Sequence, residues 1–195
     1  RTDGALVSPP NKQSALTRRA LLPTGLRDVL PPDAAHEAKT VESLIDCFET
    51  HGYERVKPPL VEFEDSLFSG PGAGMTENTF RLMDPISRRM MGARADVTVQ
   101  VARIAATRLG HLPRPLRLCY SGEVLRVTPG DLNPERELVQ VGAELVGTDT
   151  VDADAEVILL AADGLRKVGV ERMSVDITAP RLVPELLPAL GIDGA

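Results

Sequence analysis

The chain has 195 residues, which is enough for one domain with a substantial core and short for two. Its formal net charge of −6, an aromatic content of 3% and the lack of Trp disfavour a nucleic-acid-binding protein, because phosphates need a basic surface and unpaired bases stack on aromatic rings. No apolar run approaches the roughly 18 residues of a membrane span, and no apolar secretion signal opens the sequence. We therefore expect a cytoplasmic protein that contacts neither nucleic acid nor a membrane.

The polar, proline-containing stretch over residues 1–20 is typical of a flexible arm. A strong helix signal follows, with Asp33 as the expected N-cap after two prolines and Gly52 as the expected stop. Between them, the apolar positions have the i, i+3, i+4, i+7 spacing of one buried helix face and are Val41, Leu44, Ile45 and Phe48.

Residues 53–62 have an extended composition but contain Pro58 and Pro59, which cannot donate ladder hydrogen bonds. This segment is therefore expected at a sheet edge or at an interface. The glycine-rich stretch over residues 68–79 is predicted to be a loop, and residues 80–91 are predicted to form a short hairpin.

A second helix is predicted over residues 98–109, and its inward positions are Val97, Val101, Ile104 and Ala105. Alternation then predicts a strand over residues 115–126, and a cluster of turn-forming residues predicts a loop over 128–134. The two cysteines, Cys47 and Cys119, lie in apolar-patterned segments, which favours buried free thiols over a disulfide.

The strand predicted over residues 137–147 has two unlike faces. Val139, Val141, Ala143 and Leu145 share one face, whereas Leu138, Gln140, Gly142 and Glu144 share the other. Gln140 and Glu144 then project from one face about 13 Å apart, at ~3.3 Å per residue, with only Gly142 between them. A small polar ligand would fit there, but a half-exposed strand with its polar residues outward also explains the pattern.

The C-terminal part is predicted to contain a helix over residues 152–167, a strand over 173–177 and a short helix over 182–190. Asp152 is the expected cap of the first helix, and its inward positions are Ile158, Ala162 and Leu165. Hairpin-connected strands with helices between them indicate an α+β protein with a mainly antiparallel sheet.

Three further polar residues are candidates for a shared site. Asp96 and Thr98 open the second helix, where residues of these types are most often caps, and Arg126 lies where a strand meets a loop, where an arginine is usually solvated. The sequence contains no Ser–His–Asp arrangement, no metal-spaced Cys/His cluster and no phosphate-binding glycine loop. We therefore expect no catalytic residue, no metal and no cofactor.

Four separated segments, in the right order, resemble histidyl-tRNA synthetases. Residues 22–32 resemble the start of those enzymes, residues 52–67 resemble class II motif 1, residues 92–98 resemble the histidine-site segment, and residues 119–147 resemble motif 2 with the strand after it. The resemblance implies a class II aminoacyl-tRNA synthetase-like antiparallel sheet flanked by helices. By this resemblance residues 21–195 are the N-terminal part of the core domain of a longer chain.

The resemblance also implies a role for each candidate residue. Asp96 and Thr98 match positions that hold the amino group of histidine, and Gln140 and Glu144 match positions that hold its amino group and imidazole. Arg126 matches the motif 2 arginine, which grips the carboxylate and the α-phosphate. A zwitterion with an imidazole ring needs partners of these kinds.

The sequence departs from a working synthetase at several positions. Thr128 replaces the motif 2 glutamate that helps to hold ATP, Asp96 replaces a longer glutamate of the histidine-site segment, and no motif 3 is found within these 195 residues. This pattern resembles the regulatory subunits of ATP phosphoribosyltransferase. That resemblance implies a non-catalytic subunit of histidine biosynthesis that activates a short-form catalytic subunit, senses L-histidine as feedback inhibitor, forms a homodimer through its motif 1-like segment and binds no tRNA.

Two other interpretations stay open at the level of the sequence. The chain could be a fragment of a catalytically active histidyl-tRNA synthetase, against which Thr128 is the discriminating residue. It could also be a synthetase-like binding module with another ligand or partner.

Overall fold

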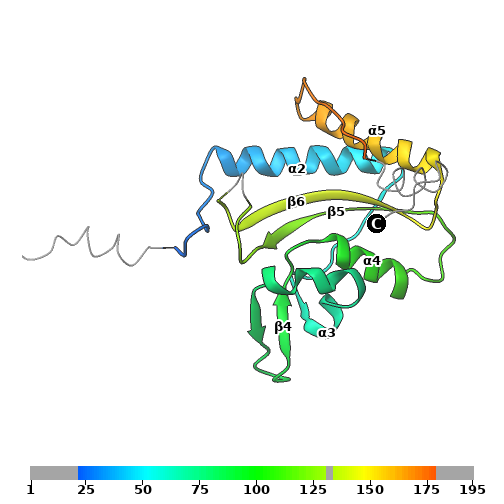
Figure 1. The fold of residues 1–195 in the computed structure, drawn as a ribbon. Coiled ribbons are helices and arrows are strands. Elements are labelled where there is room, and N and C mark those ends of the chain that lie inside the picture. The colour runs from blue at the N-terminus through cyan, green and yellow to red at the C-terminus, as the bar shows by residue number, and fades with distance from the viewer. Residues whose placement is uncertain (1–21, 131–133, 179–195) are drawn as a thin grey trace, which may run out of the picture.

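Two long antiparallel strands, β5 (Leu116–Leu125) and β6 (Glu137–Val146), form the centre of the fold (Figure 1). The computed structural model describes residues 22–130 and 134–178. The two strands pair over their whole length, from Leu116 opposite Val146 to Leu125 opposite Glu137. The short strand β1 (Glu54–Arg55) adds to the other edge of β5 in parallel. The predicted α+β class with a mainly antiparallel sheet is confirmed.

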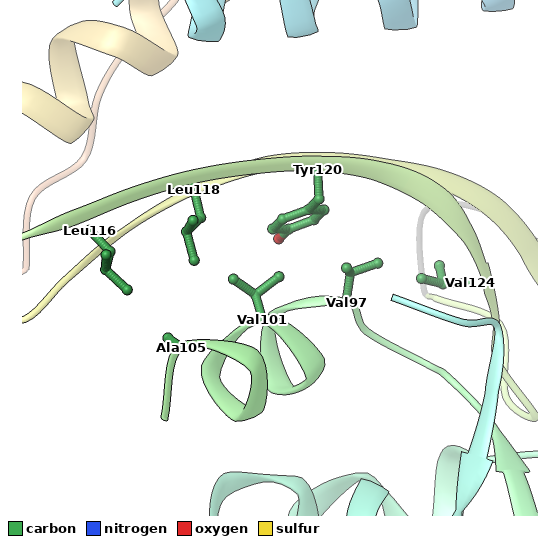
Figure 2. Packing of buried hydrophobic residues seen from close by; sticks show 7 residues of the cluster. All are labelled: Val97, Val101, Ala105, Leu116, Leu118, Tyr120 and Val124. Carbon is green, nitrogen blue, oxygen red and sulfur yellow. The ribbon is translucent and has the colours of Figure 1, made fainter. Parts of the chain in front are cut away.

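Helices cover both faces of this sheet. Alternate residues of β5 point to opposite sides, and apolar residues on each side pack against a helix. On one side, α4 (Thr98–Thr107) packs its apolar stripe against the sheet, and Figure 2 shows the side chains of the helix and of β5 pointing toward one another. That core cluster consists of Val97, Val101, Ala105, Leu116, Leu118, Tyr120 and Val124. On the other side, α2 (Asp33–Thr50) and α5 (Val151–Lys167) bury a second cluster around Ile45, Phe48, Cys119 and Leu160.

A smaller three-stranded sheet lies beyond α4 and has the order β2 (Val61–Phe63), β4 (Met90–Ala93), β3 (Arg81–Met83). Strands β3 and β4 form the predicted hairpin. Pro58 and Pro59 connect β1 to β2, and each of these is an edge strand of its sheet. The expectation that the two prolines exclude this segment from a sheet centre is therefore confirmed.

The N-caps of α2 and α5 lie one and two residues before the predicted caps. Asp33 is the first helical residue of α2 after Pro32, so it is not the N-cap, although a carboxylate in the first turn still favours the helix dipole. Asp152 likewise lies inside α5, whose cap is Thr150, with its hydroxyl oxygen accepting from the Ala153 amide at 3.3 Å. The inward assignment of Leu165 was wrong, because the helix turns that side chain outward. Gly52 ends α2, as predicted, with a φ of +84°.

Two further predictions were wrong. The glycine-rich stretch over residues 68–79 forms the 3-10 helix η1 (Gly70–Asn78) in place of a loop, and the short helix α3 (Glu64–Leu67) precedes it. Glycine is needed there for close approach, since a Cβ at Gly72 would stand 2.0 Å from the Leu67 carbonyl oxygen. The strand expected over residues 173–177 is not formed, because the alternating apolar side chains of that stretch find no strand partner in the described part of the chain. The predicted arm over residues 1–20 and the helix over 182–190 lie outside the described residues.

Cys47 and Cys119 are both buried and free, as predicted. Burial is the main cause that raises the pKa of the Cys119 thiol to about 11, so this thiol stays protonated at neutral pH. Over the ranges 22–130 and 134–178, no helix is long and apolar enough to cross a membrane.

The core on the α4 side of the sheet gives a direct stability prediction. Leu118 is 2% exposed, so Leu118→Ala should lower the free energy of unfolding by about 2–5 kcal/mol, through lost burial and the cavity left behind. Leu159 is 61% exposed on α5, so Leu159→Ala should change it by no more than about 0.5 kcal/mol. Urea unfolding of both variants checks this, and equal losses would contradict the described core.

Candidate functional site

The sheet face toward α4 carries the polar residues that the sequence analysis selected. Gln140, Gly142 and Glu144 share this face of β6, while Val141 and Ala143 pack on the opposite side, so the predicted division of the strand is confirmed. On the neighbouring strand, Tyr120 lies directly opposite Gly142. The face is otherwise apolar, because β5 contributes leucine and valine side chains to the α4 cluster.

The N-terminus of α4 is docked on this face by side-chain hydrogen bonds. The Gln140 carbonyl oxygen accepts from the Val97 amide at 2.9 Å, and its amide nitrogen donates to Asp96 Oδ1 at 3.3 Å. The same Asp96 oxygen accepts from the Thr98 amide at 2.7 Å. Asp96 therefore stabilises the start of the helix, as the simpler interpretation held, and also contacts a residue 44 positions away on β6.

Tyr120 completes the network and was not selected from the sequence. Its hydroxyl donates to Glu144 Oε1 at 3.3 Å and lies 3.1 Å from Thr98 Oγ1. The ring lies over Gly142, where a Cβ would stand 2.4 Å from the phenol oxygen. Only the β5–β6 register reveals this pairing, and the register was not part of the sequence prediction.

Arg126 lies just after β5 and contacts the same segment from the side. Its Nε donates to the Ala95 carbonyl oxygen at 3.4 Å. The structure therefore brings four predicted residues, Asp96, Thr98, Gln140 and Glu144, into one hydrogen-bonded network and places the fifth, Arg126, beside it. Within residues 22–130 and 134–178, the terminal nitrogens of Arg126 donate no hydrogen bond.

The network has an excess of acceptors and negative charge. Burial is the main cause that raises the pKa of Glu144, and the nearby Asp96 carboxylate adds to it, while hydrogen bonds from Thr98 and Tyr120 act in the opposite direction. Burial, followed by the charges of Glu144 and Asp96, raises the pKa of Tyr120 to about 12 despite the Thr98 contact. In the described part of the chain, neither carboxylate is in a salt bridge. A small organic cation would supply the missing positive charge.

The site has the groups to bind and orient a ligand. No group of three His, Cys, Asp or Glu side chains that could hold a metal ion occurs among the described residues. A cavity of about 660 Å³ lies elsewhere, between α2 and the start of β6, and none of the five predicted residues lines it. The polar groups of the site contact one another, so a ligand must take over contacts that the side chains now make between themselves.

Comparison with known protein families assigns most of the chain to one family. The histidyl-tRNA synthetase family model matches residues 25–195. The chain is 60% identical over 176 residues to the ATP phosphoribosyltransferase regulatory subunit of Rhodospirillum centenum, which covers 90% of this chain and 46% of that protein. The chain thus spans about half the length of the curated relatives that it matches.

Solved structures agree with this result. The histidine–tRNA ligase subunit from Alicyclobacillus acidocaldarius has a TM-score of 0.68 at 29% identity, over 99% of this chain and 51% of that one. The ATP phosphoribosyltransferase regulatory subunit/histidyl-tRNA synthetase from Bacillus halodurans has a TM-score of 0.65 at 28% identity, over 77% and 38% of the two chains. The predicted class II synthetase-like fold is confirmed.

The raised pKa of Glu144 predicts a pH-dependent gain in stability for Glu144→Gln. A carboxyl with a raised pKa binds its proton more tightly in the folded state, so it supports folding at low pH and loses that contribution as pH rises through the folded-state pKa. The free energy of unfolding of Glu144→Gln, relative to the parent, should therefore increase between about pH 4 and pH 7.

The matched control is Glu156→Gln, on the far face of the sheet. Hydrogen bonds from Arg117 are the main cause that lowers the pKa of Glu156, so this variant should lose relative stability as pH rises toward the unfolded-state pKa of glutamate, about 4.3, and should change little above about pH 5. Urea unfolding of the parent and both variants at several pH values measures whether each difference in the free energy of unfolding has the expected sign. A difference for Glu144→Gln that does not change with pH would contradict the assigned environment.

Proposed function

The chain belongs to the histidyl-tRNA synthetase family, and from that premise we propose that it is a non-catalytic regulatory subunit of ATP phosphoribosyltransferase. In this role it activates a short-form catalytic subunit and senses L-histidine for feedback inhibition. One observation carries the proposal: the residues expected to hold an amino acid form one network, whereas Thr128 stands where a working synthetase has an ATP-binding glutamate. Curated relatives at 58–60% identity, from Rhodospirillum centenum, Paramagnetospirillum magneticum and Rhodospirillum rubrum, are named ATP phosphoribosyltransferase regulatory subunits, and their names support the same assignment.

Histidine fits the charges of the site. Its ammonium group pairs with Asp96 and the Thr98 hydroxyl, and its imidazole N–H donates to Glu144. Its carboxylate lies toward Arg126, whose terminal nitrogens can donate two parallel hydrogen bonds. The ligand exchanges the internal contact between Gln140 and Asp96 for contacts of its own, and it supplies the positive charge that two unpaired carboxylates favour.

The start of the motif 2-like loop supports binding without reaction. The Thr128 amide donates to Asn78 Oδ1 at 2.8 Å, and the Val127 amide donates to the Asn78 carbonyl oxygen at 3.1 Å, so η1 holds this loop through its backbone. A threonine hydroxyl cannot replace a carboxylate in holding ATP. Adenylation requires charge stabilisation in the transition state, so a site without its ATP ligands binds the amino acid and leaves it unchanged.

The proposal includes the partners that the family resemblance implies. A second copy of the chain binds through the motif 1-like segment over residues 52–67, which contains the exposed edge strand β1 and Leu60, 39% exposed. The short-form catalytic subunit is the second protein partner. The net charge of −6 supports a subunit that binds no tRNA, and histidine biosynthesis places it in the cytoplasm.

A catalytically active histidyl-tRNA synthetase is the second candidate. It is favoured by the 29% identity to the histidine–tRNA ligase subunit of Alicyclobacillus acidocaldarius, which extends over 99% of this chain. The two candidates differ in what happens after histidine binds, since only the synthetase consumes ATP.

Removal of the Glu144 carboxylate tests the site. Glu144→Ala should weaken L-histidine binding by on the order of 2 kcal/mol, about 30-fold in Kd, because a desolvated ligand loses its charged partner. Calorimetric titration of the protein at its full encoded length measures this. Glu156→Ala removes a carboxylate from the opposite side of the sheet and should leave the Kd unchanged. Parent-like binding by Glu144→Ala would show that histidine does not bind at this site.

Restoring a single ATP ligand should not restore the reaction. Thr128→Glu should show no histidine-dependent exchange of pyrophosphate into ATP, because one carboxylate does not rebuild the phosphate clamp. Measurable exchange above the parent level would favour the synthetase candidate.

A further inference from the structure

Arg94 is a buried cation with no carboxylate in its hydrogen-bond shell. The residue is 4% exposed, most of its donors go to backbone carbonyls of two separate segments, and one terminal nitrogen also donates to the Gln100 side-chain oxygen at 3.4 Å. Nε donates to the Glu123 carbonyl oxygen at 2.7 Å, and one terminal nitrogen donates to the Pro58 carbonyl oxygen at 3.0 Å. A buried charge costs stability relative to an apolar side chain, so its presence here calls for a role other than stability.

The sheet is shaped to accept this guanidinium. A Cβ at Gly122 would stand 2.1 Å from the other terminal nitrogen of Arg94, so only glycine leaves room for it. Gly122 lies opposite Gln140 in the β5–β6 register. The guanidinium therefore fills the space beside the residue that docks α4, although it donates no hydrogen bond to Gln140 itself.

The backbone of Arg94 makes the same connection as its side chain. Its amide donates to the Leu60 carbonyl oxygen at 3.0 Å, and its carbonyl oxygen accepts from the Leu125 amide at 2.9 Å. Gln100, 1% exposed on α4, adds a parallel link by donating to the Pro59 carbonyl oxygen at 2.8 Å. Residues 58–60 are thus bound to the peptide that leads directly into Asp96.

We propose that Arg94 is a positioning residue that couples the 58–60 segment to the ligand-binding segment over residues 95–98. The proposal rests on the function proposed above and adds its regulation: a shift of residues 58–60, which lie in the motif 1-like interface segment, moves the residues that hold histidine. Arginine is required because the separate N–H groups of its planar guanidinium donate to carbonyl oxygens on two different segments at once. A lysine side chain has one ammonium nitrogen, which cannot reach both carbonyl oxygens.

Two variants remove this contact from opposite sides. Arg94→Lys keeps the charge but loses the planar guanidinium. Gly122→Ala keeps the arginine but places a methyl group in the space that the guanidinium occupies. In the full-length protein, each should weaken L-histidine binding about tenfold and speed hydrogen exchange at the Val97 amide. The double variant should be no weaker than the weaker single one, because both changes displace the same group.

Gly164→Ala is the matched control. A Cβ there would stand 3.2 Å from a Leu44 methyl group on the far side of the sheet, so this variant perturbs the packing of α5 on α2 and should leave histidine affinity and Val97 exchange unchanged. If Arg94→Lys and Gly122→Ala behave like this control, Arg94 supports the fold alone and the proposal is wrong. If the parent itself does not bind histidine, the proposed function fails, and Val97 exchange in the unliganded protein still decides whether Arg94 positions the segment.

Discussion

The contact between the start of α4 and the polar side chains of β6 is the constraint on which the site depends. Gln140 binds both the Val97 amide and the Asp96 carboxylate, so residues far apart in the sequence meet only when the helix docks on the sheet. The apolar stripe of α4 provides most of the stabilisation of this docking, and Figure 2 shows Val97 and Val101 below the same strand that carries Tyr120. The polar network then fixes the direction and the register of the helix.

The candidate site lies beside a hydrophobic core, and this burial determines its electrostatics. Burial raises the pKa of Glu144, and the nearby Asp96 adds to the unfavourable charge. Such a pair lowers stability when the site is empty and favours a cationic ligand when one is present. A protein selected for stability alone would have neutral or apolar side chains here, so the electrostatics of the candidate site support the proposal that it binds a ligand.

The sequence predicted this architecture where a pattern was local. The alternation along residues 137–147 assigned each side chain of β6 to its face, and the helical stripes located α2 and α4. Prediction from the sequence failed where the structure depends on long-range contacts. Tyr120 was missed because its role requires the β5–β6 register, and the strand over residues 173–177 was wrong because alternation cannot show whether a partner strand exists. The ligand contacts of the five predicted residues came from the family resemblance and stay predictions, although the structure brings those residues together.

Calorimetric titration of L-histidine into the full-length protein, run with and without Mg–ATP, separates a histidine sensor from a synthetase. A non-catalytic sensor gives a saturable heat of binding that is the same in both titrations, because the amino acid is held and ATP is not consumed. An additional heat that requires Mg–ATP would contradict a non-catalytic sensor and identify adenylate formation by a working synthetase. An absence of any binding heat would contradict the assignment of the Asp96–Glu144 network as a histidine site.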